Sequence, residues 1–144
     1  MTPGASVTEA IAEILKTCKT IAVVGLSGSR LRPSYGVADY LKSAGYRVIP
    51  VNPNAREVLG EKSYARLEEV PERVDIVVVF RRSEFVPEIA DAAMRTGART
   101  LWMQEGVVHP EAAAKARRAG IFVMMDSCIA KEHAKRFRAA EHKH

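Results

Sequence analysis

Short apolar runs alternate with segments of helical periodicity along this chain, and that alternation limits the fold more than any other feature. The most pronounced run is VDIVVVF at residues 74–80. Shorter runs lie at residues 21–24, 46–51, 100–103 and 121–124. Runs of this kind are typical of strands buried on both faces of a parallel sheet. The pattern predicts an α/β fold, a Rossmann-like open parallel sheet of about five strands with helices on both faces.

The segments between these runs carry helix signals. Ser6 and Glu9 form a Ser-x-x-Glu capping box at the start of the first helix. The apolar positions of this helix are Val7, Ile11, Ile14, Leu15 and Cys18. Further helices are expected over residues 34–44, 64–69, 84–96, 110–119 and 129–140. In the last of these, Ile129, His133 and Phe137 share one stripe, so His133 is expected to pack in the core.

The length of 144 residues fits one domain over residues 1–144, with a leading helix in residues 1–19 and a C-terminal helix and basic tail in residues 129–144. No apolar run approaches the ~20 residues of a membrane helix, and the N-terminus lacks the pattern of a secretory signal. Cys18 and Cys128 do not have metal-ligand spacing. We therefore expect a cytoplasmic protein with no membrane association and no metal site. A homo-oligomer is left open.

The net charge is +5, and residues 131–144 contribute +3 of it. A basic tail of this kind can attract nucleic acid or another polyanion. The same pattern is common on the solvated face of a terminal helix. We favour the solvated face, so nucleic acid is not expected as a partner.

The loop after the first apolar run is the strongest candidate for ligand binding. In open parallel sheets, ligands bind beyond the carboxyl ends of the strands, near the point where strand order reverses. The loop has the sequence GLSGSRLRPSYG at residues 25–36. Glycines let backbone N–H groups approach an anion, and the following helix N-terminus and the arginines Arg30 and Arg32 add positive charge. Gly36 is expected to allow close helix–strand contact. The loop is neither G-x-G-x-x-G nor a P-loop, but its position favours phosphate binding over a simple turn.

The second run ends in Val51-Asn52-Pro53, where a nicotinamide-binding domain would place Asp or Glu to hold the ribose. Neither is present, which argues against NAD. Arg56 follows and suits an additional phosphate, so NADP remains an alternative.

The third run ends in Phe80-Arg81-Arg82. The arginines suit a pyrophosphate or a 3′-phosphate, and Phe80 suits packing on an adenine. Alternatively, the arginines pair with Glu84 or Glu88 at the surface.

Five motifs together resemble the stand-alone bacterial CoA-binding proteins, which are similar to the N-terminal domain of the succinyl-CoA synthetase alpha subunit. The motifs are IAVVGLS at residues 21–27, RPSYGV at 32–37, VIPVNP at 48–53, VFRRS at 79–83 and QEGV at 104–107. The resemblance covers nearly the whole chain. It implies a CoA-binding Rossmann-like domain whose small-molecule nucleotide ligand is coenzyme A or an acyl-CoA.

The resemblance also implies which residues bind the ligand. They are Gly25, Leu26, Ser27, Gly28, Arg32, Pro33, Tyr35, Gly36, Asn52, Pro53, Arg56, Phe80, Arg81, Arg82, Gln104, Glu105 and Gly106. The first loop would face the CoA phosphates, the segment from Asn52 to Arg56 the adenosine end, and the segment from Gln104 to Gly106 the pantetheine. Residues 126–128, Asp-Ser-Cys, match a Pro-Asn-Cys stretch of the family, with Ser127 in place of the asparagine.

No residue is assigned a catalytic role. The chain ends before the second domain whose histidine the synthetase phosphorylates, so we expect binding without turnover. For His109, a position at a helix start is favoured over a phosphohistidine or general-base role. For Cys128, a half-buried structural position is favoured over a reactive thiol. The alternative function is an NADP-binding oxidoreductase or a component of an acyl-CoA ligase.

Overall fold

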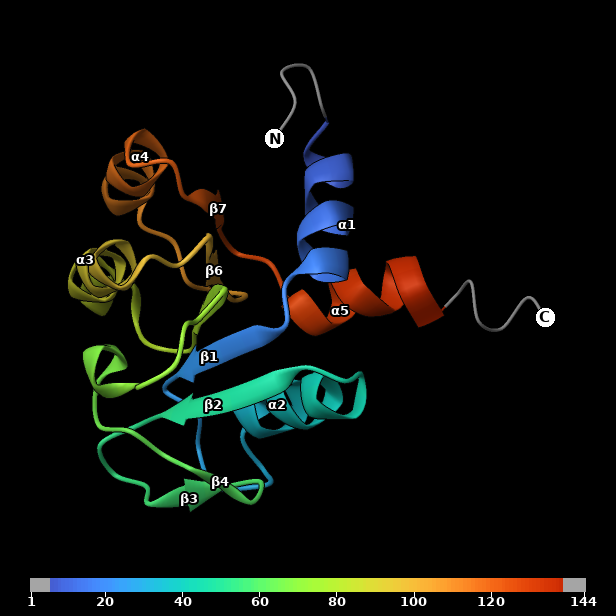
Figure 1. Cartoon of the computed structure of the whole chain (residues 1–144), viewed down its shortest axis with the longest axis vertical. Helices are drawn as coiled ribbons and strands as arrows, with labels where there is room; N and C mark the ends of the chain where they lie inside the picture. Colours follow the sequence, from blue (N-terminus) through green and yellow to red (C-terminus); the bar gives the residue numbers. More distant parts are fainter. Residues whose placement is uncertain (1–5, 139–144) are drawn as a thin grey trace.

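Parallel strands form a five-stranded sheet in the order β2-β1-β5-β6-β7 (Figure 1). The computed structural model describes residues 6–138. The strands are β1 (Thr20–Val24), β2 (Arg47–Val51), β5 (Ile76–Val79), β6 (Thr100–Met103) and β7 (Phe122–Met124). Each predicted apolar run contains one strand, and the Rossmann-like α/β fold is confirmed.

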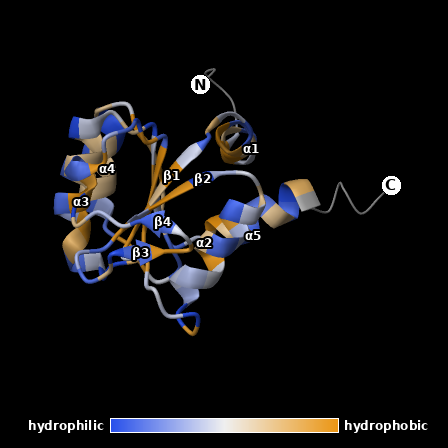
Figure 2. Ribbon diagram, turned by 60° about the horizontal axis from the view of Figure 1, so that its bottom comes forward, coloured by the Kyte–Doolittle hydropathy of each residue, from blue (hydrophilic) through white to orange (hydrophobic). Residues whose placement is uncertain are grey.

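Helices cover both faces of this sheet (Figure 2). On one face lie α3 (Val86–Thr96) and α4 (Pro110–Arg118). On the other lie α1 (Val7–Thr17), α2 (Pro33–Ser43) and α5 (Ile129–His133). No helix among the described residues is long and apolar enough to cross a membrane.

Two apolar clusters form the core, one on each face of the sheet. Successive side chains of a strand point to opposite faces. Val77 and Val79 therefore join the cluster beneath α3 and α4, while Ile76 and Val78 join the cluster beneath α1, α2 and α5. All four side chains are fully buried. This burial explains why residues 76–79 include no polar side chain.

The first helix begins as its capping box predicts. The side-chain oxygen of Ser6 accepts a hydrogen bond from the Glu9 N–H at 3.0 Å. The prediction that Val7 joins the apolar stripe is wrong, because Val7 is 61% exposed. The first turn of α1 projects beyond the sheet (Figure 1), so nothing covers this side chain among the described residues.

The short helix predicted over residues 64–69 is largely wrong. The segment before it forms a hairpin of β3 (Glu57–Val58) and β4 (Glu61–Lys62), and only Leu67–Glu69 forms a 3₁₀ turn. Leu59 and Gly60 join the hairpin with φ of +55° and +77°. Positive φ at both central residues is characteristic of two-residue hairpin turns. Leucine rarely occupies such a position, which hid the turn from the sequence.

Two other helix boundaries differ from the prediction. The segment Ser83–Phe85 is a 3₁₀ turn, and α3 begins only at Val86. The helix predicted over residues 129–140 is α-helical over Ile129–His133 and π-helical over Ala134–Arg138, while residues 139–144 lie outside the described residues.

Candidate functional site

The backbones of Gly25 and Phe80 approach closely where β1 and β5 end. A Cβ atom built on Gly25 would lie 2.5 Å from the Phe80 carbonyl oxygen, and Gly25 has a φ of +89°. Only glycine fits this approach without strain. The helices that follow β1 and β5 cover opposite faces, so the strand order reverses between these strands. Gly25 thus lies where open α/β sheets bind ligands.

Asn52 connects the end of β2 to the same point. Its Nδ2 donates a hydrogen bond to the Leu26 carbonyl oxygen at 2.9 Å, and its Oδ1 accepts one from the Asn54 N–H at 2.8 Å. The Leu26 side chain is fully buried. The Asn52 side chain therefore holds the two loops together, while the Leu26 side chain packs in the cluster beneath α1, α2 and α5. Leu26 could therefore contact a ligand only through its backbone.

Serines fix the conformation of the loop after β1. The Ser27 N–H donates to Ser34 Oγ, and the Ser29 N–H donates to Ser27 Oγ, each at 3.0 Å. The Leu31 N–H donates to Ser29 Oγ at 3.3 Å. Ser34 is buried in the first turn of α2 and was not predicted as a site residue. A serine in the first turn of the helix after a glycine loop is the sequence signal that identifies it.

Two backbone donors of this loop remain available. Among the described residues, the N–H groups of Gly28 and Arg30 have no hydrogen-bond partner. Gly28 is exposed, and a Cβ atom on it would meet nothing within 4 Å. The N–H groups of Ser27, Ser29 and Leu31 thus donate to serine side chains. The N–H groups between them in the sequence, those of Gly28 and Arg30, are available to an anion. Unpaired backbone N–H groups in an exposed glycine loop are donors that an anion could use.

The arginines around the site differ in their partners. Arg30, Arg32 and Arg56 are exposed and form no ion pair within residues 6–138. Arg82 pairs with Glu84 at 3.3 Å. Arg81 instead stacks on the Phe85 ring, with the guanidinium carbon 4.2 Å from the ring centroid. The alternative of surface ion pairing is therefore right for Arg82 and wrong for Arg81.

A pocket of about 590 Å³ opens beside these strand ends. Val24 and Val51 form part of its floor, and Pro53 and Arg81 border it. Glu68 also lines the pocket, and a hydrogen bond from Arg95 holds the pKa of its carboxyl below the ordinary value. The volume falls in the range of small-molecule sites. Phe80 is half-buried and packs on the α2 side, within the cluster beneath α1, α2 and α5, so it does not line this pocket.

The loop after β6 is held by its own contacts. Gln104 is 3% exposed, and its Oε1 accepts a hydrogen bond from the Ile129 N–H at 3.0 Å, which caps α5. Glu105 pairs with Lys131 at 3.0 Å. The Gly106 N–H donates to Asp126 Oδ1 at 2.7 Å. The predicted pantetheine residues thus follow the carboxyl end of β6, and their side chains or N–H groups form local contacts.

The remaining predicted ligand residues lie in the first turns of α2. Pro33 occupies the start of the helix, and Tyr35 is half-buried against the α2-side core. The prediction that Gly36 permits close helix–strand contact is wrong. A Cβ atom on Gly36 would meet nothing within 4 Å, because this residue faces away from the sheet.

His109 and Cys128 both occupy helix starts, as favoured from the sequence. His109 Nδ1 accepts a hydrogen bond from the Ala112 N–H at 3.1 Å and so caps α4. Cys128 precedes α5 and is buried as a free thiol. Within the described residues, no group of three or more His, Cys, Asp or Glu side chains is arranged to hold a metal ion.

Known proteins are similar to this chain over nearly its whole length. The Bacillus subtilis protein YneT is 45% identical over 124 residues, covering 86% of this chain and 92% of that protein. The structure of a hypothetical protein from Pyrococcus horikoshii superposes with a TM-score of 0.87 at 36% identity, covering 92% of each chain. Both comparisons extend over almost the whole described domain.

The acetate–CoA ligase (ADP-forming) II of Archaeoglobus fulgidus is 31% identical over 81 residues. The match covers 55% of this chain but only 12% of the ligase, so this chain is homologous to a small part of that enzyme. The similarity to the succinyl-CoA synthetase alpha subunit stays a prediction. Residues 19–134 match the sequence model of the CoA binding domain. The chain therefore belongs to the CoA binding domain family.

Proposed function

We propose that this chain binds coenzyme A or an acyl-CoA non-covalently in the cytoplasm, without catalysing its turnover. The observation that carries the proposal is the convergence of three strand ends at Gly25, Asn52 and Phe80, where the sheet order reverses. Family membership favours CoA over other nucleotides.

The phosphates would bind to the loop after β1. The N–H groups of Gly28 and Arg30 have no partner among the described residues, and Arg30 and Arg32 add positive charge at the same loop. The start of α2 contributes a favourable dipole. A ligand with several phosphates would match these donors and also Arg56, at the adjacent loop after β2.

The nucleoside end would occupy the pocket beside Val24, Val51 and Pro53. Its apolar floor suits a base, and the Arg81 guanidinium at its edge suits a phosphate. The pantetheine would continue along the ends of β5 and β6 toward Gly106. Binding without turnover fits the role of His109, whose Nδ1 is occupied in capping α4.

Calorimetry with CoA, dephospho-CoA and NADPH tests this proposal. We expect one CoA per chain, weaker binding of dephospho-CoA because it lacks the 3′-phosphate, and little heat for NADPH. Chromatography of the CoA after prolonged incubation should recover it unchanged. Tight binding of NADPH with no heat for CoA would support the NADP-linked alternative. Conversion of an acyl-CoA by the purified chain would contradict the absence of turnover.

A further inference from the structure

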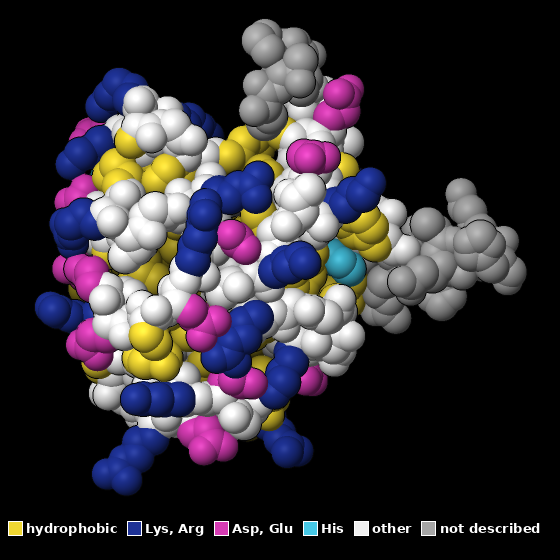
Figure 3. Space-filling view, in the orientation of Figure 1, with side chains coloured by type: hydrophobic (Ala, Val, Ile, Leu, Met, Phe, Trp, Pro, Cys, Tyr) yellow, Lys and Arg dark blue, Asp and Glu magenta, His cyan; other side chains and the backbone are white. Residues whose placement is uncertain are grey.

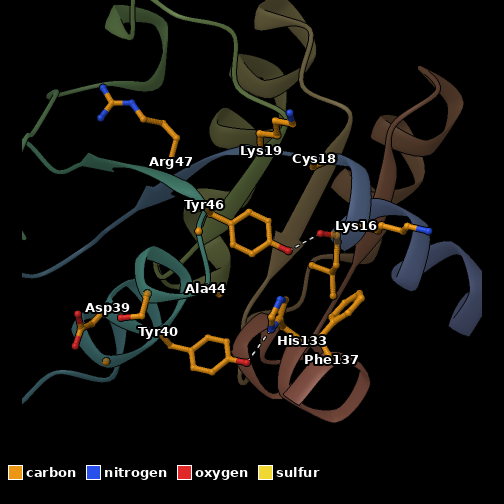
Figure 4. A pocket seen from close by; sticks show the side chains of 14 residues that line it. Lys16, Cys18, Lys19, Asp39, Tyr40, Ala44, Tyr46, Arg47, His133 and Phe137 are labelled. Atoms are coloured by element: carbon orange, nitrogen blue, oxygen red, sulfur yellow. Dashed lines mark hydrogen bonds between the residues drawn. The ribbon is translucent and has the colours of Figure 1, made fainter. Parts of the chain in front are cut away.

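A second pocket, of about 1020 Å³, lies where α1, α2 and α5 meet (Figure 4). Cys18, just before β1, and Arg47, the first residue of β2, both line it. It therefore lies at the amino ends of these strands, whereas the nucleotide loops follow their carboxyl ends, roughly 13 Å away along a strand of this length. Gly36, near the start of α2, borders its nearer side. The proposed CoA function does not use this space.

Aromatic side chains form one wall of the pocket. The His133 ring centroid lies 5.4 Å from that of Tyr40, 5.6 Å from that of Tyr46 and 4.8 Å from that of Phe137. Tyr40 Oη and His133 Nδ1 are hydrogen-bonded at 2.7 Å, and the Tyr46 hydroxyl donates to the Leu15 carbonyl oxygen. These bonds come from three different elements and hold the rings in place (Figure 4). The wall is thus formed before any ligand arrives.

The charged groups of the pocket leave it positive. Lys16 and Lys19 line it and form no ion pair with any described residue, whereas Arg47 is already paired with Glu61 and Glu72. Figure 3 shows Lys and Arg side chains on this face of the molecule, with Asp and Glu side chains among them. Asp39 is the acidic residue among the lining side chains.

Two other titratable groups of the lining stay neutral near pH 7. Burial raises the pKa of the Cys18 thiol above its ordinary value and raises that of the Tyr46 phenol to about 12. Neither group therefore adds negative charge that would repel an anion.

We propose that this pocket binds a small aromatic anion, with its ring against the wall of Tyr40, His133 and Phe137 and its anionic group toward Lys16 and Lys19. Flat apolar rings pack favourably on such a wall. The two ammonium groups give the pocket its preference for a negative substituent. An uncharged ring of the same shape should bind more weakly.

The probe is 2-naphthoate, added to ¹⁵N-labelled full-length protein and followed by amide chemical shifts. For a ligand of this size we expect a Kd on the order of 1 mM. The amides of Tyr40, Gly45, Tyr46 and His133 should shift together. The same shifts should occur with saturating CoA present, because the two sites are separate. The uncharged 2-naphthamide should bind roughly threefold more weakly.

Variants test, independently of the chemical shifts in the wild-type protein, whether 2-naphthoate binds in this pocket. Lys16→Glu should weaken 2-naphthoate roughly threefold, whereas Arg118→Glu, the same charge change on exposed α4, should not. Ser43→Trp should abolish the shifts by filling the pocket, with circular dichroism verifying the fold. Shifts confined to residues 25–32 and removed by CoA would overturn the proposal, as would no shifts at several millimolar. Neither result would bear on CoA binding itself, which calorimetry measures separately.

Discussion

Gly25 and Phe80 are packed backbone to backbone, with the Phe80 carbonyl oxygen 2.5 Å from the position of a Cβ atom on residue 25. Gly25→Ala would combine this clash with a strained φ of +89°. We predict a loss of about 3 kcal/mol in the free energy of unfolding, since each effect costs on the order of 1–3 kcal/mol. Urea denaturation measures it. A loss below about 1 kcal/mol would mean that the two strand ends separate easily.

Gly28→Val tests the phosphate loop without disturbing the fold. A Cβ atom at Gly28 meets nothing within 4 Å, and Gly28 is not among the glycines with positive φ. The free energy of unfolding should therefore change by no more than about 0.5 kcal/mol. The branched side chain should shield the Gly28 and Arg30 N–H groups and weaken CoA at least tenfold, or about 1.4 kcal/mol. Normal CoA affinity in this variant would show that the phosphates bind elsewhere.

Asn52 offers a test of how the loops are held together. Asn52→Ala removes both the bond to Leu26 and the bond from Asn54, which should cost about 1–2 kcal/mol of stability and weaken CoA. Asn52→Asp keeps an acceptor for Asn54 but loses the donor and adds negative charge near the phosphates. We predict that the Asp variant is the poorer CoA binder of the two, and that it is no more stable, because a carboxylate oxygen would then face the Leu26 carbonyl oxygen. Equal CoA affinities would contradict this electrostatic account.

Gln104 should matter more for stability than for ligand contact. It is buried, and Gln104→Ala would leave the Ile129 N–H without its acceptor. We expect a loss of about 2 kcal/mol in the free energy of unfolding. CoA affinity, measured by calorimetry well below the melting temperature, should change less than in Gly28→Val. A large loss of affinity in a stable Gln104→Ala protein would instead favour direct contact with pantetheine.

Acid stability should depend on the pair of Glu72 and Arg47. The hydrogen bond from Arg47 holds the pKa of the Glu72 carboxyl below its ordinary 4.5. The folded-state pKa is thus lower than the unfolded one, so the stabilisation is present above pH 4.5 and is lost as the pH falls through the folded-state pKa. In Glu72→Gln, the free energy of unfolding should decline less steeply below about pH 4.5.

The sheet was predictable because its strands are continuous apolar runs. Ile76 to Val79 are fully buried and lie in a sheet covered on both faces, so a continuous apolar run of strand length identified them. The hairpin around Leu59 and Gly60 was not predictable, because its strands are two residues long and its turn uses a leucine at positive φ. Tertiary contacts, including the bridge between Val51 and Tyr64, determine that segment.

The loops of the site were predictable, but the orientation of their side chains was not. A strand end followed by glycine identifies a loop at the ligand edge. It does not reveal that Asn52 points to Leu26, that Gln104 caps α5 or that Gly36 faces away from the sheet. Those orientations depend on neighbours distant in the sequence. Ser34 is a different case, because its partner, the Ser27 N–H, is close in the sequence, and a serine in the first turn of the helix after a glycine loop was the signal that could have identified it.

Native mass spectrometry of the purified chain titrated with CoA measures whether the protein binds this ligand and how many molecules it binds. We expect a single added CoA mass on the wild-type protein. Excess unlabelled CoA should displace isotope-labelled CoA, and the adduct should be strongly reduced in Gly28→Val. Absence of a CoA adduct under conditions where NADPH remains bound would contradict the proposed CoA binding.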